Sequence, residues 1–282
     1  MSSGGTPPDG SLLLKLRGVK KSFGAVQAVN GVDLDIVRGK VTALVGDNGA
    51  GKSSLIKTIS GLWEQDEGEI LWEGKPVRLR TPKDSEALGI TTIYQDLALC
   101  DNLDIVQNMF LGHEELRHFT LDEGSMEITA KKILAELEVT TVRSVRQPVA
   151  SLSGGQRQSV AVAKAVMSNA KLVIMDEPTA ALGVSQTAQV LALIKRLASN
   201  GVTVLVISHN LNDVFEVADE IAILRLGRIV ASGPIDTFDS STVVDYMTTG
   251  RTERVLATAG SGTGSGSSGS TNVTNSGNGG GQ

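Results

Sequence analysis

The strongest constraint on the fold of this chain is a glycine-rich loop set between an apolar run and a helical pattern. The run is Val41–Val45, and the loop reads Gly46-Asp47-Asn48-Gly49-Ala50-Gly51-Lys52-Ser53. Glycines let backbone N–H groups close on phosphate oxygens, and a helix that begins at Lys52 adds positive potential at its N-terminus. The order of strand, loop and helix is the context that this phosphate-binding motif requires. The loop therefore predicts a nucleotide site within an α/β fold.

The last residues of the loop and two later carboxylates carry the chemistry of the predicted site. Lys52 is expected to pair with the β- and γ-phosphates, and Ser53 to offer its hydroxyl to Mg²⁺. Asp176 ends an apolar strand, as the acid on the Mg²⁺ side does in such enzymes. Its alternative is a strand-end carboxylate that caps a loop. The adjacent Glu177 points elsewhere on an extended chain, and could orient or deprotonate the water that attacks the γ-phosphate.

Two polar residues follow other predicted strands at the same edge of the sheet. Gln95 follows Ile90–Tyr94, and His209 comes after Val202–Ile207. Ligands of open α/β sheets gather at the carboxyl ends of the strands. We therefore interpret His209 as a contact to the γ-phosphate, and Gln95 as a ligand of Mg²⁺ or of the attacking water. The alternative for each is an ordinary polar residue leaving a strand.

Phe23 lies in a turn between the first two predicted strands. An aromatic ring at that place could stack on adenine. The spacing is equally compatible with an aromatic side chain of the core, so both interpretations stay open.

A second glycine-rich, serine-containing loop follows about a hundred residues after the first, and it reads Leu152-Ser153-Gly154-Gly155-Gln156. One nucleotide site does not need two anion-binding loops so far apart. The simplest hypothesis is that the second loop caps a nucleotide held by another copy of the fold. The chain is accordingly predicted to form a dimer.

Strand and helix patterns alternate along residues 11–250, which predicts a parallel sheet covered on both faces. The stretch from about 97 to 168 reads as a helical insertion. Expected strands are Leu12–Val19, Ala28–Ile36, Val41–Val45, Glu69–Glu73, Val77–Arg80, Ile90–Tyr94, Leu172–Met175, Val202–Ile207 and Ile221–Leu226. Expected helices are Lys52–Ser60, Asp104–Leu111, Glu127–Val139, Gly154–Ser168, Ser185–Ala198 and Leu211–Val217.

Composition excludes several classes of protein. The formal charge of −5 gives no electrostatic case for binding nucleic acid. A single cysteine, Cys100, permits neither an intrachain disulfide nor a cysteine metal cluster. No apolar stretch approaches the roughly 20 residues that span a bilayer, and the start of the chain does not read as a secretory signal. Residues 1–10 are expected to be a flexible lead, and residues 251–282 a disordered tail rich in Gly, Ser, Thr and Asn.

The order and spacing of these motifs over residues 12–248 resemble the ATP-binding subunits of ABC transporters. The resemblance implies a RecA-like P-loop NTPase core, an antiparallel β-subdomain and an inserted helical subdomain that bears the second loop. It implies that two subunits sandwich two ATP molecules, with Ser153, Gly154 and Gly155 on the γ-phosphate of the opposite subunit. Glu177 corresponds to the catalytic base. Gln95 belongs to the loop that senses the membrane subunit, and Phe23 fits the adenine-stacking position.

The expected site combines these inferences. Catalytic roles are expected for Lys52, Gln95, Glu177 and His209, and metal ligation for Ser53, Gln95 and Asp176. ATP is expected to contact Phe23, Gly46, Asp47, Asn48, Gly49, Ala50, Gly51, Lys52, Ser53, Ser54, Ser153, Gly154, Gly155 and Gln156.

Two segments narrow the resemblance to importers of the ribose, xylose and fructose type. They are residues 87–97 and the run Asn108-Met109-Phe110-Leu111-Gly112. Gly183 stands where the wider family often has an aspartate, and it fits the same group. The resemblance implies a peripheral subunit on the cytoplasmic face of the membrane, partnered by a second copy, by permease subunits and indirectly by an extracytoplasmic sugar-binding protein. The alternatives are an amino-acid importer, a soluble ABC ATPase, and a regulatory module without turnover.

Overall fold

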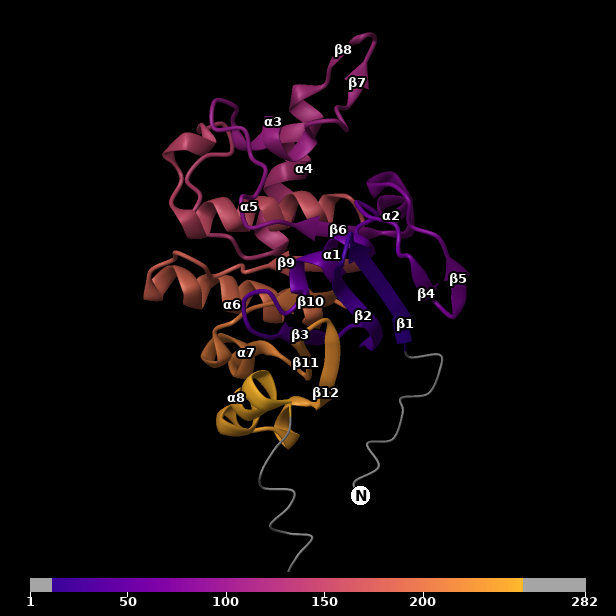
Figure 1. Ribbon diagram of the computed structural model, residues 1–282. Helices are drawn as coiled ribbons and strands as arrows, with labels where there is room; N and C mark the ends of the chain where they lie inside the picture. Colours follow the sequence, from indigo (N-terminus) through magenta and orange to yellow (C-terminus); the bar gives the residue numbers. More distant parts are fainter. Residues whose placement is uncertain (1–11, 251–282) are drawn as a thin grey trace, which may run out of the picture. The chain divides into compact units, whose positions relative to one another are not determined.

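The computed structural model describes residues 12–250, and these residues form two main sheets with helices packed around them (Figure 1). The larger sheet has the strand order β12-β11-β3-β10-β9-β6, with β12 antiparallel to β11 and the other neighbouring pairs parallel. Its strands are β3 (Val41–Val45), β6 (Ile90–Ile93), β9 (Leu172–Asp176), β10 (Thr203–Ile207), β11 (Glu220–Arg225) and β12 (Arg228–Pro234). Residues 1–10 and 251–282, expected to be a flexible lead and a disordered tail, lie outside the described part of the chain.

The strands of the larger sheet send alternate side chains into two separate cores. In β3, Val41, Ala43 and Val45 enter one core, and Leu44 enters the other. Strands β9, β10 and β11 alternate in the same way. A fully buried side chain of this kind contributes roughly 1.5–3 kcal/mol. Burial on both faces therefore holds each strand in its place in the sheet. The carboxyl ends of the parallel strands carry the candidate site.

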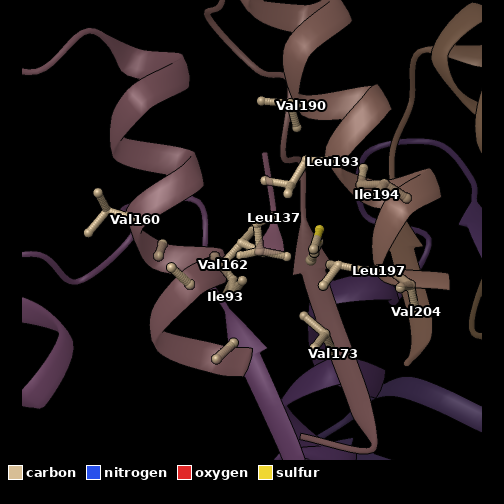
Figure 2. Packing of buried hydrophobic residues seen from close by; sticks show 14 of the residues in the cluster. Ile93, Leu137, Val160, Val162, Val173, Val190, Leu193, Ile194, Leu197 and Val204 are labelled. Carbon is tan, nitrogen blue, oxygen red and sulfur yellow. The ribbon is translucent and has the colours of Figure 1, made fainter. Parts of the chain in front are cut away.

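Helices cover the first of these faces. Those against the sheet are α5 (Gly154–Met167), α6 (Val184–Ser199) and α7 (Leu211–Val217), while α3 (Ile105–Phe110) and α4 (Glu123–Glu136) pack on α5. Figure 2 shows Leu197 of α6 beside Val173 of β9, with Leu193 of α6 and Val162 of α5 bordering the same space and Val160 farther out on α5. The expected fold of a phosphate-loop core with helices is confirmed.

Helix α1 (Lys52–Ile59) and the second sheet cover the other face. This sheet is antiparallel in the order β2-β1-β4-β5, and it confirms the expected antiparallel β-subdomain. Its strands are β1 (Leu12–Phe23), β2 (Val26–Val37), β4 (Glu67–Trp72) and β5 (Lys75–Val77). A strand predicted at Val77–Arg80 is wrong, because Glu73 and Gly74 turn the chain at positive φ (50° and 77°) and pairing starts at Lys75. Arg80 instead precedes α2 (Pro82–Leu88).

The region between β6 and α5 departs most from the predicted elements. Helix α4 begins four residues before the predicted start at Glu127, because Asp122 accepts a hydrogen bond from the Ser125 amide (3.1 Å) and caps the helix there. A short hairpin of β7 (Leu116–Arg117) and β8 (Thr120–Leu121), which the pattern did not predict, precedes it. Helix α8 (Ser240–Thr249) closes the described chain. Among the helices of residues 12–250, none has the length and apolar character needed to cross a membrane.

Candidate nucleotide site

The phosphate loop is held on two sides by backbone that only glycine can approach so closely. A Cβ on Gly46 would lie 2.2 Å from the carbonyl oxygen of Leu224, at the end of β11. A Cβ on Gly51 would lie 2.3 Å from the carbonyl oxygen of Ala28 in β2, and Gly51 has a φ of 107°. The amide of Gly227 also donates to the carbonyl of Ala50 (2.8 Å). The loop is therefore wedged between the two sheets with its conformation fixed before any ligand binds.

Lys52 lies folded over the loop that it ends. Its side chain is buried, and Nζ donates to the carbonyl oxygens of Gly46 (2.6 Å) and Asp47 (3.1 Å). Two carbonyl oxygens thus accept hydrogen bonds from the buried ammonium group and offset part of the cost of burying its charge. The same group can turn its remaining donor capacity to a phosphate, since a lysine ammonium carries three N–H bonds.

A cavity of about 480 Å³ opens at the carboxyl ends of the parallel strands. It falls within the usual range for small-ligand sites of roughly 300–1,000 Å³. The structure brings together there most of the residues expected to bind phosphate, metal and water: Asp47, Asn48, Gly49, Ala50, Gly51, Lys52, Ser53, Ser54, Gln95, Asp176 and Glu177. Val26, Gln27, Ala28, Leu226 and Gly227 complete the wall, and none of these five was predicted as a site residue. Gly227, a turn-forming residue directly after the expected strand Ile221–Leu226, is the sequence signal that could have pointed to the last two.

Glu177 and His209 meet at the edge of this cavity. Nδ1 of His209 lies 2.9 Å from Oε2 of Glu177. The Glu177 side chain is mostly buried, whereas that of His209 is 64% exposed. The amide of Glu177 also donates to the carbonyl of Ile207 (2.9 Å), which ties the segment after β9 to the end of β10. His209 itself does not line the cavity, so within this chain it reaches the cavity through Glu177.

Asp176 sits in an electrostatic environment that suits a cation. Burial raises the pKa of its carboxyl group, the charge of Glu177 raises this pKa further, and Lys52 opposes both. Within residues 12–250 no three His, Cys, Asp or Glu side chains gather into a metal cluster. A divalent cation here would therefore use Ser53, Gln95 and Asp176 together with phosphate oxygens of the substrate, which is the donor set of P-loop enzymes. The residues present fit that set.

The second glycine-rich loop lies outside this cavity and forms the start of α5. Ser153 caps the helix: its Oγ accepts from the amide of Gln156 (3.3 Å), and its own amide donates to Oε1 of Gln156 (2.9 Å). A Cβ on Gly154 would lie 2.6 Å from Cδ2 of Leu182, and one on Gly155 would lie 3.2 Å from Cβ of Gln186. The two glycines therefore let α5 pack closely against the start of α6, a structural role that the sequence pattern did not reveal.

Phe23 lies at the tip of β1, and it does not line the cavity. Its ring packs edge to face on Trp63 with a centroid distance of 4.6 Å, and it is 41% exposed. The ring is therefore not a buried core side chain, and its stacking on adenine stays a prediction.

A further contact near the carboxylates was not anticipated from the sequence. Oγ1 of Thr179 donates to Oδ2 of Asp213 (2.6 Å), and the Asp213 side chain is buried in α7. This bond joins the segment that follows Glu177 to the helix that follows His209. It holds the two loops that position these residues in a fixed relation.

The fold and the cavity define a P-loop nucleotide-binding protein with a mixed α/β core and an antiparallel β-sheet. A family model described as ABC transporter matches residues 29–180. The chain belongs to the family of ABC transporter ATP-binding proteins, and ATP is the nucleotide of that family.

Individual relatives match over most of the chain. The fructose import ATP-binding protein FrcA of Rhizobium meliloti is 47% identical over 84% of this chain and 94% of that protein. The xylose/arabinose import ATP-binding protein XylG of Sulfolobus acidocaldarius is 46% identical, also over 84% and 94%. The ribose import ATP-binding protein RbsA of Caldanaerobacter subterraneus subsp. tengcongensis is 39% identical over 83% of this chain, which spans about half (47%) of that longer protein.

Solved structures of ATP-binding cassettes have a fold similar to that of this chain. An ATP-binding cassette of an ABC transporter superposes with a TM-score of 0.74 at 28% identity, covering 83% of this chain and 96% of that one. A nucleotide-free cassette superposes with a TM-score of 0.70 at 28% identity, covering 79% and 91%.

Proposed function

We propose that this chain is the ATP-hydrolysing subunit of an importer for a monosaccharide such as ribose, xylose or fructose. The observation that carries the proposal is the 47% and 46% identity, over nearly the whole length of each, to two sugar import ATP-binding proteins. The cavity with Lys52, Asp176 and Glu177 supplies the site that such hydrolysis needs.

Each residue at the cavity has a distinct part in the proposed reaction. The loop amides and Lys52 bind the phosphates of ATP and stabilise the charge of the transferred group. Glu177 accepts a hydrogen bond from the attacking water and directs it to the γ-phosphate. His209 orients the Glu177 carboxylate through the 2.9 Å contact. Mg²⁺ bound by Ser53, Gln95 and Asp176 would neutralise phosphate charge. Phe23 stays a proposal as the ring that stacks on adenine.

The second loop supplies the other half of the site in a dimer. Ser153 is exposed at the N-terminus of a 14-residue helix, where backbone amides and the helix dipole favour an anion. Because it lies outside the cavity of its own chain, we assign Ser153, Gly154, Gly155 and Gln156 to a γ-phosphate held by a second copy. Two copies then enclose two ATP molecules.

A groove next to Gln95 offers a route from the nucleotide to a membrane subunit. This groove, of about 630 Å³, is lined by Tyr94, Leu97 and Ala98 after β6, by Phe110 at the end of α3 and His113 after it, and by Lys164 of α5. Gln95 of the same loop lines the nucleotide cavity. Any movement of Gln95 would therefore change the contacts of a permease segment bound in the groove. We therefore propose that the chain is a peripheral subunit on the cytoplasmic face of the membrane, working indirectly with an extracytoplasmic sugar-binding protein.

Glu177→Gln tests the proposed chemistry. Hydrolysis by the chain co-expressed with its permease should fall roughly 10²–10⁴-fold, because the general base is lost while ATP binding is kept. Phosphate release and ATP affinity are measured side by side. Glu136→Gln, on the exposed face of α4, is the matched control and should hydrolyse like the wild type. Unchanged hydrolysis in Glu177→Gln would mean that the assigned mechanism is wrong.

Uptake of labelled cargo tests the assignment to sugars. Vesicles that contain the co-expressed complex should accumulate a labelled monosaccharide when ATP is supplied. Accumulation of an amino acid instead would establish the amino-acid importer, and recovery of ribosomes or DNA with no membrane protein would establish a soluble ABC ATPase. Absence of phosphate release under every condition would establish a regulatory module without turnover.

A further inference from the structure

The two residues at the tip of the β7–β8 hairpin are not residue types that the geometry of the turn favours. Leu116 pairs with Leu121 and Arg117 with Thr120, so the loop consists of His118 and Phe119 alone. Both loop residues have positive φ, 49° and 72°. Two-residue hairpin loops with this backbone favour Asn-Gly, and a bulky aromatic residue is a poor choice on local grounds.

The apolar side chains of the hairpin are turned to solvent. Phe119 is fully exposed, and it is the most exposed large apolar side chain among residues 12–250. Leu116 is 70% exposed and Leu121 is 51% exposed. Because Leu116 and Leu121 lie opposite each other in the ladder, their side chains share one face of the hairpin. Gathered apolar groups of this kind, on a segment that packs little against its own chain, are typical of an interaction surface.

The hairpin continues directly from the groove proposed for the membrane subunit. Phe110, His113 and Glu115 line that groove, and the hairpin begins at the next residue, Leu116. Figure 1 shows β7 and β8 extending away from α3 and α4 rather than folding back on the sheets. A partner seated in the groove would thus reach the hairpin without crossing another element.

The charges that flank the hairpin indicate which partner it fits. Residues 114–122 hold three carboxylates, Glu114, Glu115 and Asp122, against one arginine, Arg117, and one histidine, His118. Hydrogen bonds from the amides of Gly112 and of Glu114 itself lower the pKa of the Glu114 carboxyl, which keeps it ionised. An acidic margin is repelled by anionic lipid. It complements the cytoplasmic loops of membrane proteins, which carry an excess of Lys and Arg.

We propose that the hairpin is a second docking contact for the membrane subunit, with Phe119 inserted between basic cytoplasmic loops and Leu116 and Leu121 covered by them. The inference rests on the proposed function, because it takes a permease as the partner of this chain. The contact lies outside the nucleotide site, so it acts on the affinity and coupling of the two subunits and leaves the chemistry of hydrolysis alone.

The test compares complexes of the full chain with its co-expressed permease in detergent. Phe119→Ser should weaken association roughly tenfold or more, as expected for an aromatic residue at the centre of an interface. The double variant His118→Asn with Phe119→Gly should weaken it equally, although Asn-Gly suits the turn better and keeps the hairpin folded. Val244→Ser, at a 45% exposed site on α8, is the control and should associate like the wild type.

The outcomes separate this inference from the proposed function. If the wild type binds the permease and both hairpin variants bind as tightly, the hairpin inference is overturned while the importer assignment stands. If the wild type itself associates with no permease, the proposed function fails. Permease-free vesicles, one set of phosphatidylcholine and one with added phosphatidylserine, give the last arm. Binding that needs Phe119 in either set would make lipid the occupant and contradict the proposal, and no binding supports it.

Discussion

Two glycine-rich, serine-containing loops begin helices in this chain, and they are built differently. The loop before α1 is enclosed by backbone on two sides, and its residues line a cavity with Gln95 and two carboxylates. The loop before α5 lines no part of that cavity, and its glycines face the side chains of Leu182 and Gln186. Ser153 uses its hydroxyl to cap its own helix and stays exposed.

The difference shows that similar local chemistry can serve a complete site or half of one. The first loop has its acids, its lysine and its metal-binding groups within reach in the same chain. The second has an exposed helix N-terminus, and within residues 12–250 the acids, the lysine and the metal-binding groups line the cavity of the first loop instead. The second loop can bind an anion but completes no site in its own chain. This arrangement is explained if a second copy supplies the rest of the site. The four predictions below test this contrast between the complete site and the second loop, in order of expected effect.

Ser153→Arg carries the largest expected effect. A large cation at the start of α5 should keep the loop from the γ-phosphate of the one site that it completes, and lower hydrolysis at that site by about 10²-fold or more, as loss of a transition-state contact does. Nucleotide affinity of the isolated monomer should stay within about twofold, because the cavity of its own chain is untouched. Parallel measurement of phosphate release and monomer binding checks both. Weak binding by the monomer would place the loop in its own site.

Gly46→Ala and Gly154→Ala sharpen the contrast between the loops. A methyl group on Gly46 would meet the backbone oxygen of Leu224 at 2.2 Å, and backbone cannot yield without moving β11. Chemical unfolding should show a loss of about 3 kcal/mol, with ATP binding lost as well. A methyl group on Gly154 would meet the movable end of Leu182 at 2.6 Å. That variant should lose about 1 kcal/mol or less, because alanine also favours the helix. Equal losses of unfolding free energy in the two variants would contradict the proposed difference between the two loops.

Asp176→Asn tests the electrostatics of the complete site. Burial raises the pKa of Asp176, so its ionised form destabilises the folded chain. This destabilisation is present above the folded-state pKa and disappears as the pH falls toward the ordinary value of 3.8. Without nucleotide, the variant should therefore melt at a higher temperature than the wild type near neutral pH. The difference should shrink on acidification, and a constant difference across a pH series of melting curves would contradict this origin.

Gly183→Asp carries the smallest expected effect. Gly183 is the N-cap of α6 with an extended backbone and open space at its Cβ position. An aspartate there can cap the helix and should add a few tenths, about 0.3 kcal/mol, to the free energy of unfolding. Urea denaturation measures that gain. A loss of stability would mean that the start of α6, against which Gly154 and Gly155 pack, does not tolerate a side chain.

The sequence predicted the buried parts of the fold most accurately. Val41–Val45 was predicted with the bounds that β3 has, and β9 and β10 differ from prediction by a residue at one end. Strands buried on both faces read as short continuous apolar runs, which leave little freedom in placing them. The β7–β8 hairpin gave no such signal, because its two-residue strands are exposed and too short to show an alternating pattern. Strand β12 and helix α8 were also missed.

Site residues were likewise predicted most accurately where they follow buried strands. Residues at the ends of buried strands, such as Asp176 and Gln95, were expected near the phosphate loop and lie at its cavity. Contacts between side chains of different loops could not be predicted from the sequence pattern. The bond between Thr179 and Asp213 joins residues 34 positions apart, and no periodicity marks either one. The packing of Gly154 on Leu182 was hidden for the same reason, since it depends on how two helices approach.

Mixing two inactive variants tests the shared site most directly. Lys52→Ala removes the phosphate-binding lysine, and Ser153→Arg removes the second loop. If the loops of different copies complete each other, a mixed dimer holds one site with neither change. An equal mixture should then recover about a quarter of the wild-type hydrolysis rate, since half of the dimers are mixed and each has one intact site. If each loop serves its own chain, neither subunit has a working site, and the mixture would stay as inactive as the two variants alone.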